Sequence, residues 1–163
     1  MGELMMQQKN QRDEVDSLFV QLCGDSLLVP MSAVAEVVQH VDCKPQADAP
    51  VWLQGWVEWR KQRVPLISFE TLSGVGEQRG SDISLALVMN TLNDSPNSTS
   101  GFAFYAIQIQ AFPNLVRISE DDQLQEVAGT LEVPYTMMKV GLDEWVALIP
   151  DLDSLEKYLS ENL

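Results

Sequence analysis

Hydrophobic and polar residues alternate along most of the chain in short runs, which is the pattern of half-buried β-strands. Leu18, Val20 and Leu22 occupy alternate positions of one run, so their side chains share one face of an extended segment. Gly24-Asp25 follows as a tight turn, and residues 26–29 are predicted to return as the second arm of a hairpin. We therefore expect the folded part of the chain to begin with paired antiparallel strands.

Similar runs recur down the chain, separated by turn-forming residues. Ser32 is predicted to begin a short helical turn, with Glu36 near its first amides. Residues 151–159 carry leucines at helical spacing and predict a C-terminal amphipathic helix. With about ten short strands and no helix long enough for a parallel βαβ unit, the chain is predicted to be an all-β barrel or sandwich. The further strands are expected at residues 37–41, 55–60, 63–69, 83–92, 102–110, 115–118, 137–141 and 145–149.

The composition is acidic. Among 163 residues there are 24 Asp and Glu against 10 Lys and Arg, a formal net charge of −14. Such a surface repels the phosphates of nucleic acids and of anionic membranes, so neither is expected as a partner. A basic protein surface is the natural counterpart, although the charge also serves solubility.

No apolar stretch approaches the roughly 20 residues that a membrane span needs, so no membrane insertion is expected. Residues 1–16 are Gln-rich and charged and lack the apolar core of a signal peptide, and we interpret them as a disordered leader. Cys23 and Cys43 are far apart and without C-x-x-C spacing, as in a reducing compartment. The expected location is the cytoplasm.

Catalytic and metal-binding patterns are missing from the sequence. His40 is the single histidine, in an alternating run where an exposed strand residue is expected rather than a catalytic base. Two separated cysteines and one histidine do not make a zinc site, and the acid pairs lack the spacing of a calcium loop. We therefore expect no enzyme activity, no cofactor and no tightly bound metal.

Three elements of the first half carry a more specific pattern. They are Val34-Ala35-Glu36-Val37, Gly55-Trp56-Val57-Glu58-Trp59-Arg60 and Val64-Pro65-Leu66-Ile67-Ser68-Phe69. In this order, after the first hairpin, they resemble the V-x-E element, the glycine-to-arginine strand and the V-P strand of CheW-like domains. The second half matches more loosely, through residues 83–88, 104–109 and 145–152. The tryptophan-arginine strand most resembles members associated with type IV pili, the ChpC or PilI kind.

The resemblance implies a fold of two five-stranded SH3-like barrels sharing a core, with short helices and a C-terminal helix. On this basis the domain spans residues 17–163 after the leader. The expected parts are a first lobe at about 17–74, a second lobe at about 82–150 and a terminal helix at 151–161.

The resemblance also implies a function. Members of the family are non-enzymatic adaptors that couple the tip of a methyl-accepting chemoreceptor to the regulatory domain of a chemotaxis-type histidine kinase. Val34, Glu36 and Arg60 are the partner-binding positions that carry over to this sequence. Arg60 has an alternative as an intrachain partner of Glu36 or Glu58, and Glu36 has one as a solvated helix acid.

Two features depart from the family pattern, and one of them is Ile107-Gln108-Ile109, which lacks the acid of the family's V-D ending. Lys61 occupies the position of the glycine that follows the arginine in the family, so a turn with positive φ is expected to be strained or rebuilt. The strands around it are predicted to turn at Lys61-Gln62. Trp56 and Trp59 are an odd number of residues apart and face opposite sides of a strand, and we predict Trp56 to be the core residue.

Other hypotheses stay open at this point. An all-β ligand-binding or regulatory module, with a pocket lined by tryptophans, is the main alternative to the adaptor, and an enzyme of unrecognised type is the third. Residues 93–101 combine three Asn or Asp with Pro and Gly, and we predict them to be the most mobile internal loop.

Overall fold

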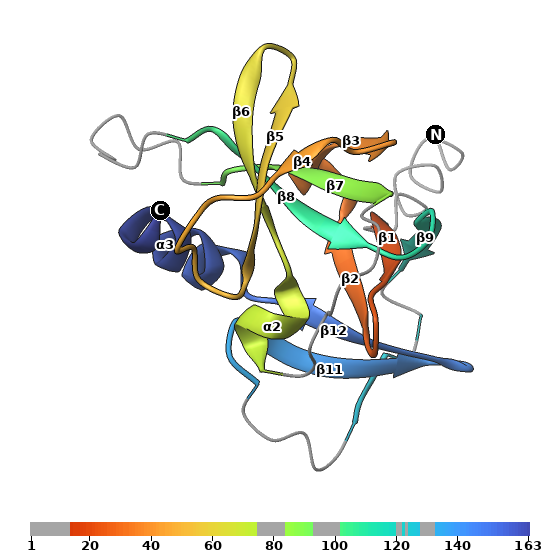
Figure 1. The fold of residues 1–163 in the computed structure, drawn as a ribbon. Coiled ribbons are helices and arrows are strands. Elements are labelled where there is room, and N and C mark those ends of the chain that lie inside the picture. Colours follow the sequence, from red (N-terminus) through yellow and green to blue (C-terminus); the bar gives the residue numbers. More distant parts are fainter. Residues whose placement is uncertain (1–13, 75–83, 93–101, 120–121, 123, 128–132) are drawn as a thin grey trace, which may run out of the picture.

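The structure is a computed structural model that describes residues 14–74, 84–92, 102–119, 122, 124–127 and 133–163. Twelve strands dominate these ranges, together with two helices and one 3-10 turn (Figure 1). The elements are β1 (Val15–Gln21), β2 (Ser26–Pro30), η1 (Met31–Ala33), β3 (Val34–Gln39), β4 (Cys43–Lys44), β5 (Leu53–Trp59), β6 (Gln62–Ile67), α2 (Phe69–Ser73), β7 (Leu85–Asn90), β8 (Phe104–Ile109), β9 (Asn114–Ile118), β10 (Gln125–Glu126), β11 (Thr136–Leu142), β12 (Trp145–Pro150) and α3 (Leu152–Asn162). The predicted all-β class, with a C-terminal helix, is confirmed.

The strands form two six-stranded sheets, and all strands of one sheet, β3 to β8, lie in the sequence between β2 and β9 of the other. One has the order β10-β11-β12-β2-β1-β9 and the other β3-β7-β8-β6-β5-β4. We call them the outer barrel and the hairpin barrel. The first hairpin thus joins the C-terminal strands, because β2 pairs with β12 and β1 with β9. The sheets do not divide the chain at residues 74–82, where the sequence predicted a boundary between lobes.

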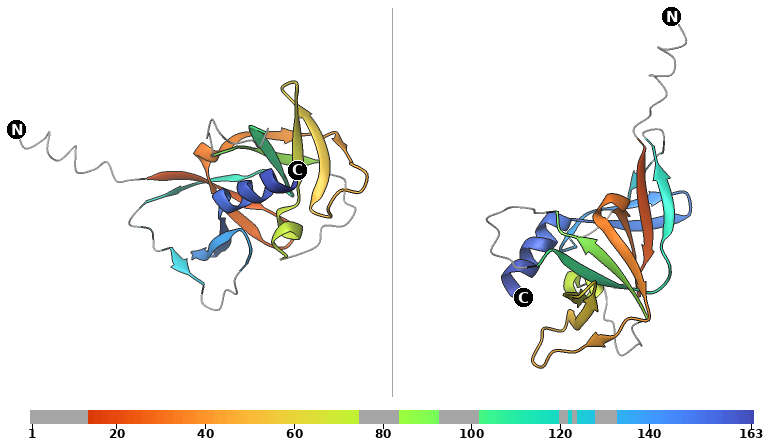
Figure 2. Two further views of the ribbon diagram at one scale, coloured as in Figure 1. Left: turned by 90° about the vertical axis from the view of Figure 1, so that its left-hand side faces the viewer. Right: turned by 90° about the horizontal axis from the view of Figure 1, so that it is seen from above.

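Each barrel has its own small interior, and a larger core lies between them. The shared core takes Val20, Leu27 and Val29 from the outer barrel and Leu87, Met89, Tyr105 and Ile107 from the hairpin barrel, all fully buried. Helix α3 contributes Leu155 and Leu159 to it and lies along one side of the molecule (Figure 2). Burial of such side chains contributes about 1.5–3 kcal/mol each, so the two barrels and α3 stabilise one another.

Helix α3 begins where the sequence placed it. The Asp151 side chain caps the helix by accepting from the Ser154 backbone amide at 3.2 Å. Glu156, on the same helix, is buried and accepts from the Leu92 backbone amide with both carboxylate oxygens, at 2.8 and 3.0 Å. None of the helices in the described ranges has the length and apolarity needed to cross a membrane.

The helical turn predicted from Ser32 is wrong beyond its first residues. Met31–Ala33 form a 3-10 turn, and Val34–Gln39 then continue as strand β3, so Glu36 is a strand residue rather than a helix acid. Residues 34–39 contain three valines, whose branched side chains favour a strand, and β7 offers them a pairing partner. Pairing along the sheet outweighs the local capping signal.

The N-terminal strand also starts earlier than predicted. Strand β1 begins at Val15, so the last two residues of the expected leader belong to the sheet. Their register is fixed by β9, where Asp16 pairs with Arg117. Residues 1–13 and the loop 93–101, predicted to be mobile, lie outside the described residues.

Glu70 is a buried carboxyl that links helix α2 to the first hairpin. It is 2% exposed, and its Oε1 accepts from the backbone N–H of Cys23 in the β1–β2 turn. Its Oε2 has no hydrogen-bond partner among the described residues. Burial raises the pKa of Glu70 above its ordinary value of 4.5, the Cys23 amide lowers it in part, and Asp25 raises it further.

The raised pKa of Glu70 makes a testable contribution to stability. A carboxyl with a raised pKa in the folded state stabilises the fold below its unfolded pKa and loses that contribution as pH rises through the folded pKa. The native chain should therefore lose stability relative to Glu70→Gln as pH rises above 4.5. Urea unfolding of both proteins between pH 4 and pH 8 measures the difference, and a difference that stays constant with pH would refute the account.

Candidate partner-binding site

The β5–β6 hairpin projects from the hairpin barrel and ends in a two-residue turn (Figure 1). Trp59 pairs with Gln62, so Arg60 and Lys61 form the turn, one residue earlier than predicted. Both have positive φ, 47° and 61°, as in the type I′ turns that match the twist of a tight hairpin. The turn is thus kept without glycine, and the strain expected at Lys61 is present.

Relief of that strain should stabilise the fold. Left-handed backbone costs a non-glycine residue about 1–2 kcal/mol, and glycine adopts it freely. Lys61→Gly is expected to raise the free energy of unfolding by about 1 kcal/mol. Chemical denaturation measures the change, and Lys157→Gly, in the last turns of α3, is the opposite control because glycine destabilises a helix by about 1 kcal/mol. An unchanged or lower stability for Lys61→Gly would contradict the strained turn.

Glu36 and Arg60, both singled out from the sequence, meet between β3 and the hairpin. Glu36 Oε2 accepts from Trp59 Nε1 at 2.7 Å and lies 3.5 Å from Arg60 Nη2. The Arg60 guanidinium also stacks on Trp59, with Cζ 4.4 Å from the ring centroid. The intrachain ion pair considered from the sequence therefore exists. Both side chains nevertheless stay accessible, at 66% for Arg60 and 46% for Glu36, so partners can reach them.

The two tryptophans of β5 face opposite ways, but Trp59 rather than Trp56 is the core residue. Trp59 is 6% exposed and packs edge-on against Phe104, at 4.8 Å between centroids. Trp56 is half-buried on the outer side, where its Nε1 donates to Gln46 at 2.7 Å and Arg63 stacks 4.7 Å from its ring. Alternate residues from Leu53 to Trp59 are buried, and this register decides between the two.

Val34 is less available than the two charged residues. It begins β3, is half-buried and packs against the shared core. Its pairing with Met89 on β7 is followed by a register irregularity before Glu36. A change at Val34 would thus alter packing as well as any surface contact.

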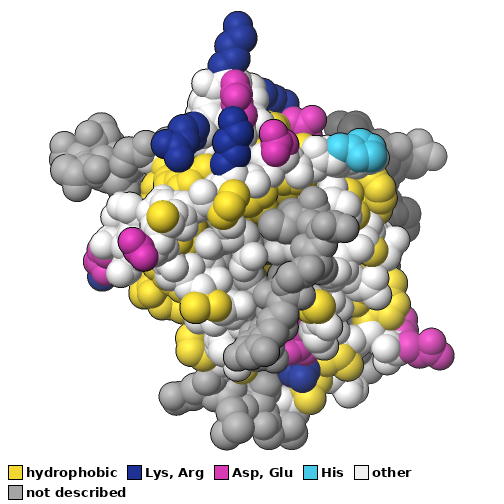
Figure 3. Space-filling view, viewed as in Figure 1, with side chains coloured by type: hydrophobic (Ala, Val, Ile, Leu, Met, Phe, Trp, Pro, Cys, Tyr) yellow, Lys and Arg dark blue, Asp and Glu magenta, His cyan; other side chains and the backbone are white. Residues whose placement is uncertain are grey.

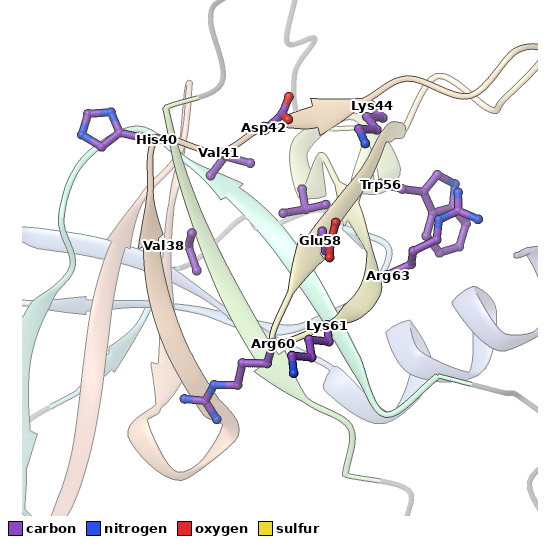
Figure 4. Close-up of a pocket in the computed structure, with 11 residues that line it drawn as sticks. Val38, His40, Val41, Asp42, Lys44, Trp56, Glu58, Arg60, Lys61 and Arg63 are labelled. Carbon is purple, nitrogen blue, oxygen red and sulfur yellow. The ribbon is translucent and has the colours of Figure 1, made fainter.

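A groove that sequence reasoning missed lies beside this pair, between β3 and β5 (Figure 4). We call it the hairpin groove. Its volume is about 530 Å³, and it is lined by Val38, His40, Val41, Asp42, Lys44, Trp56, Val57, Glu58, Arg60, Lys61 and Arg63. Cys43 packs beneath it in the barrel interior, and burial, together with nearby Asp42, raises the pKa of its thiol. The thiol is therefore held in its neutral form.

The side chains of this site are charged and aromatic groups at the surface. Within the described ranges, no group of three or more His, Cys, Asp or Glu residues is placed to hold a metal ion. His40 lies at the edge of the groove and points outward (Figure 4). An exposed arginine-glutamate pair, arginines stacked on tryptophans and a groove lined by four cations are groups of the kind that bind protein surfaces.

Comparison with known proteins identifies the family to which this double barrel belongs. The family model of the CheW-like domain matches residues 16–158, so the chain belongs to the CheW-like domain family. The fold resembles the crystal structure of scaffolding protein TtCheW from Thermoanaerobacter tengcongensis, with a TM-score of 0.64 and 15% identity. The match covers 83% of this chain and 88% of that one. Comparison with curated protein sequences gives no significant match.

These findings confirm the predicted fold. The SH3-like double barrel with a shared core is present, and each sheet has six strands where five were predicted. The additional strands include β4 and β10, which are two residues long each and lie at sheet edges. A strand of two residues is too short to show an alternating pattern in the sequence.

Proposed function

We propose that this chain is a non-enzymatic cytoplasmic scaffold of a chemosensory pathway. It joins the regulatory domain of a chemotaxis-type histidine kinase to the tip of a methyl-accepting receptor. The match of the CheW-like domain to residues 16–158 carries the proposal, since proteins of this family serve as scaffolds rather than enzymes. The exposed heads of Glu36 and Arg60 add a surface of the kind such contacts use.

The ligand-binding alternative has less support. Of Trp52, Trp56 and Trp59, only Trp56 lines the hairpin groove. Trp52 and Trp59 are 7% and 6% exposed and are used in packing. A pocket lined by several tryptophans is therefore not what this part of the molecule offers.

Direct binding tests the proposal. The full chain is immobilised and exposed separately to a purified kinase regulatory domain and to a purified receptor cytoplasmic fragment from the same genome. Both are expected to bind, and each should bind while the other is already in place. Binding of neither protein, with the chain folded by circular dichroism, would overturn the scaffold role.

The pathway output is proposed from the strand that carries Trp56, Trp59 and Arg60, which resembles the corresponding strand of pilus-associated CheW-like proteins. We expect deletion of the gene to impair twitching motility and to leave swimming intact. Complementation with the native gene is the control. A deletion strain that twitches normally but swims without chemotaxis would assign the protein to the flagellar pathway instead.

A further inference from the structure

The cations of this chain are distributed unevenly. Four of its ten Lys and Arg residues, namely Lys44, Arg60, Lys61 and Arg63, line the hairpin groove, against two acids, Asp42 and Glu58. The chain as a whole has a net charge of −14. The space-filling view shows dark-blue side chains gathered around the β5–β6 hairpin (Figure 3). The groove is thus a local cationic site on an acidic protein.

Most of these cations are not neutralised within the chain. Arg60 pairs with Glu36, but in the part of the chain that the structure describes Lys44, Lys61 and Arg63 form no ion pair. Arg63 is held against Trp56 by stacking, as seen side by side in Figure 4. An arginine stacked in this way is already ordered and keeps its N–H donors free, so it loses little entropy when it binds a carboxylate.

The groove also has an apolar floor. It consists of three valines that line the groove between its charged side chains. Val38 and Val41 are half-buried, and Val57 is buried at the edge of the barrel. The floor is open because β5 is paired to β4 only through Cys43 and Lys44. His40, with φ of 52°, turns the chain away from β3 just before that pairing. Strands β3 and β5 therefore diverge, and the space between them can accept a side chain of a partner protein.

We propose that the hairpin groove binds an acidic segment of a partner protein, with an apolar side chain on the valine floor and flanking carboxylates on Lys44, Lys61 and Arg63. This inference rests on the proposed scaffold function and names the chemistry of one partner at that site. Charge complementarity selects the occupant, because the groove is cationic while the rest of the chain is acidic. A nucleic acid presents its charge over a long surface and would meet the acidic remainder of the molecule.

A defined peptide tests this inference. The probe is a short fluorescein-labelled peptide of alternating glutamate and leucine, titrated with the full chain and followed by anisotropy. Binding is expected to weaken about tenfold or more in the double variant Lys61→Glu, Arg63→Glu, and to weaken as salt is raised. Lys157→Glu, an exposed lysine of α3 outside the groove, makes the same type of change and should bind as the native chain does.

The location of the peptide is read from amide chemical shifts. Shifts are expected at Val38, Val41 and the Trp56 indole N–H, and not on α3. If the double variant unfolds, Lys44→Gln with Arg63→Gln replaces it, since both side chains are exposed and glutamine removes the charge while staying polar. Equal binding of a peptide with glutamine in place of glutamate would overturn the proposal. So would tighter binding of an oligothymidylate, shifts confined to other surfaces, or a self-association of this chain that the groove variants abolish.

Failure of this inference is distinguishable from failure of the scaffold role. If the receptor and the kinase bind normally to the Lys61→Glu, Arg63→Glu variant, the acidic segment is wrong and the scaffold stands. If neither protein binds the native chain while the peptide binds in the groove, the scaffold role is wrong and the groove assignment stands.

Discussion

Gly55→Ala is expected to lower the free energy of unfolding by about 3 kcal/mol. Gly55 has φ of +151°, a conformation that a residue with a side chain rarely adopts. A Cβ there would lie 2.5 Å from the backbone oxygen of Lys44 and 2.6 Å from Cys43 Sγ. Since the nearest obstacle is backbone, β4 would have to move away from β5, and the wall of the hairpin groove would open. Urea denaturation followed by tryptophan fluorescence measures the loss.

Gly24→Ala is the matched control for this prediction. Gly24 lies in the turn between β1 and β2, and a Cβ there meets nothing within 4 Å. Its substitution should change stability by no more than about 0.5 kcal/mol. Equal effects of the two alanines would mean that the close approach of β4 to β5 is not what requires glycine at position 55.

Arg60→Ala is expected to weaken binding of a chemosensory partner about thirtyfold, equivalent to about 2 kcal/mol, with a much smaller effect on the fold. An exposed ion pair contributes about 0–1 kcal/mol to stability, and the stacking of Arg60 on Trp59 adds about 0.5–1 kcal/mol. The loss of a charge at the centre of an interface costs more than either. Binding by calorimetry and unfolding by urea, on the same preparations, separate the two effects.

A variant of Glu36, the ion-pair partner of Arg60, must preserve the hydrogen bond from the Trp59 indole. Glu36→Arg would leave the buried indole N–H of Trp59 without its acceptor and is expected to cost about 1–3 kcal/mol in stability, so it confuses binding with folding. Glu36→Gln keeps an acceptor oxygen and removes only the charge. It should therefore weaken partner binding in the same direction as Arg60→Ala at little cost in stability.

Arg117→Ala supplies the control on the other barrel. Arg117 is exposed on β9 and pairs with Asp16 at 3.0 Å, so its removal also breaks a surface ion pair. Partner binding should be unchanged in this variant. A large drop in melting temperature for Arg60→Ala would make Arg60 an internal brace, and unchanged binding for both Arg60→Ala and Glu36→Gln would remove these residues from the interface.

The local elements of the fold could be predicted from sequence because their signals are local. Alternation around Leu18 to Leu22, the Gly24-Asp25 turn and the leucines of α3 each lie within a few residues and specify one conformation. The division of the strands between the two sheets could not be predicted in the same way. Strand β2 meets β12 in parallel pairing more than a hundred residues away, which no short window contains.

The site was only partly accessible to sequence reasoning for the same reason. Glu36 and Arg60 were named from motifs, but their ion pair depends on β3 lying beside the β5–β6 hairpin. The assignment of Trp56 to the core was wrong, because Trp59 shares its face of the strand with the buried Leu53 and Val57, whereas Trp56 lies on the opposite face. Lys44, Lys61 and Arg63 come from different elements, so their shared groove appears only in the folded chain. The signal in the sequence that could have pointed to this groove was the small number of Lys and Arg residues in an acidic chain.

One measurement tests the scaffold role most directly. Purified kinase is mixed with membranes that carry a methyl-accepting receptor, with and without this chain, and the kinase that sediments with the membranes is quantified. The account predicts that the native chain increases the sedimented kinase, that Arg117→Ala does the same, and that Arg60→Ala does not. Sedimentation of the kinase to the same extent with and without the native chain would contradict it.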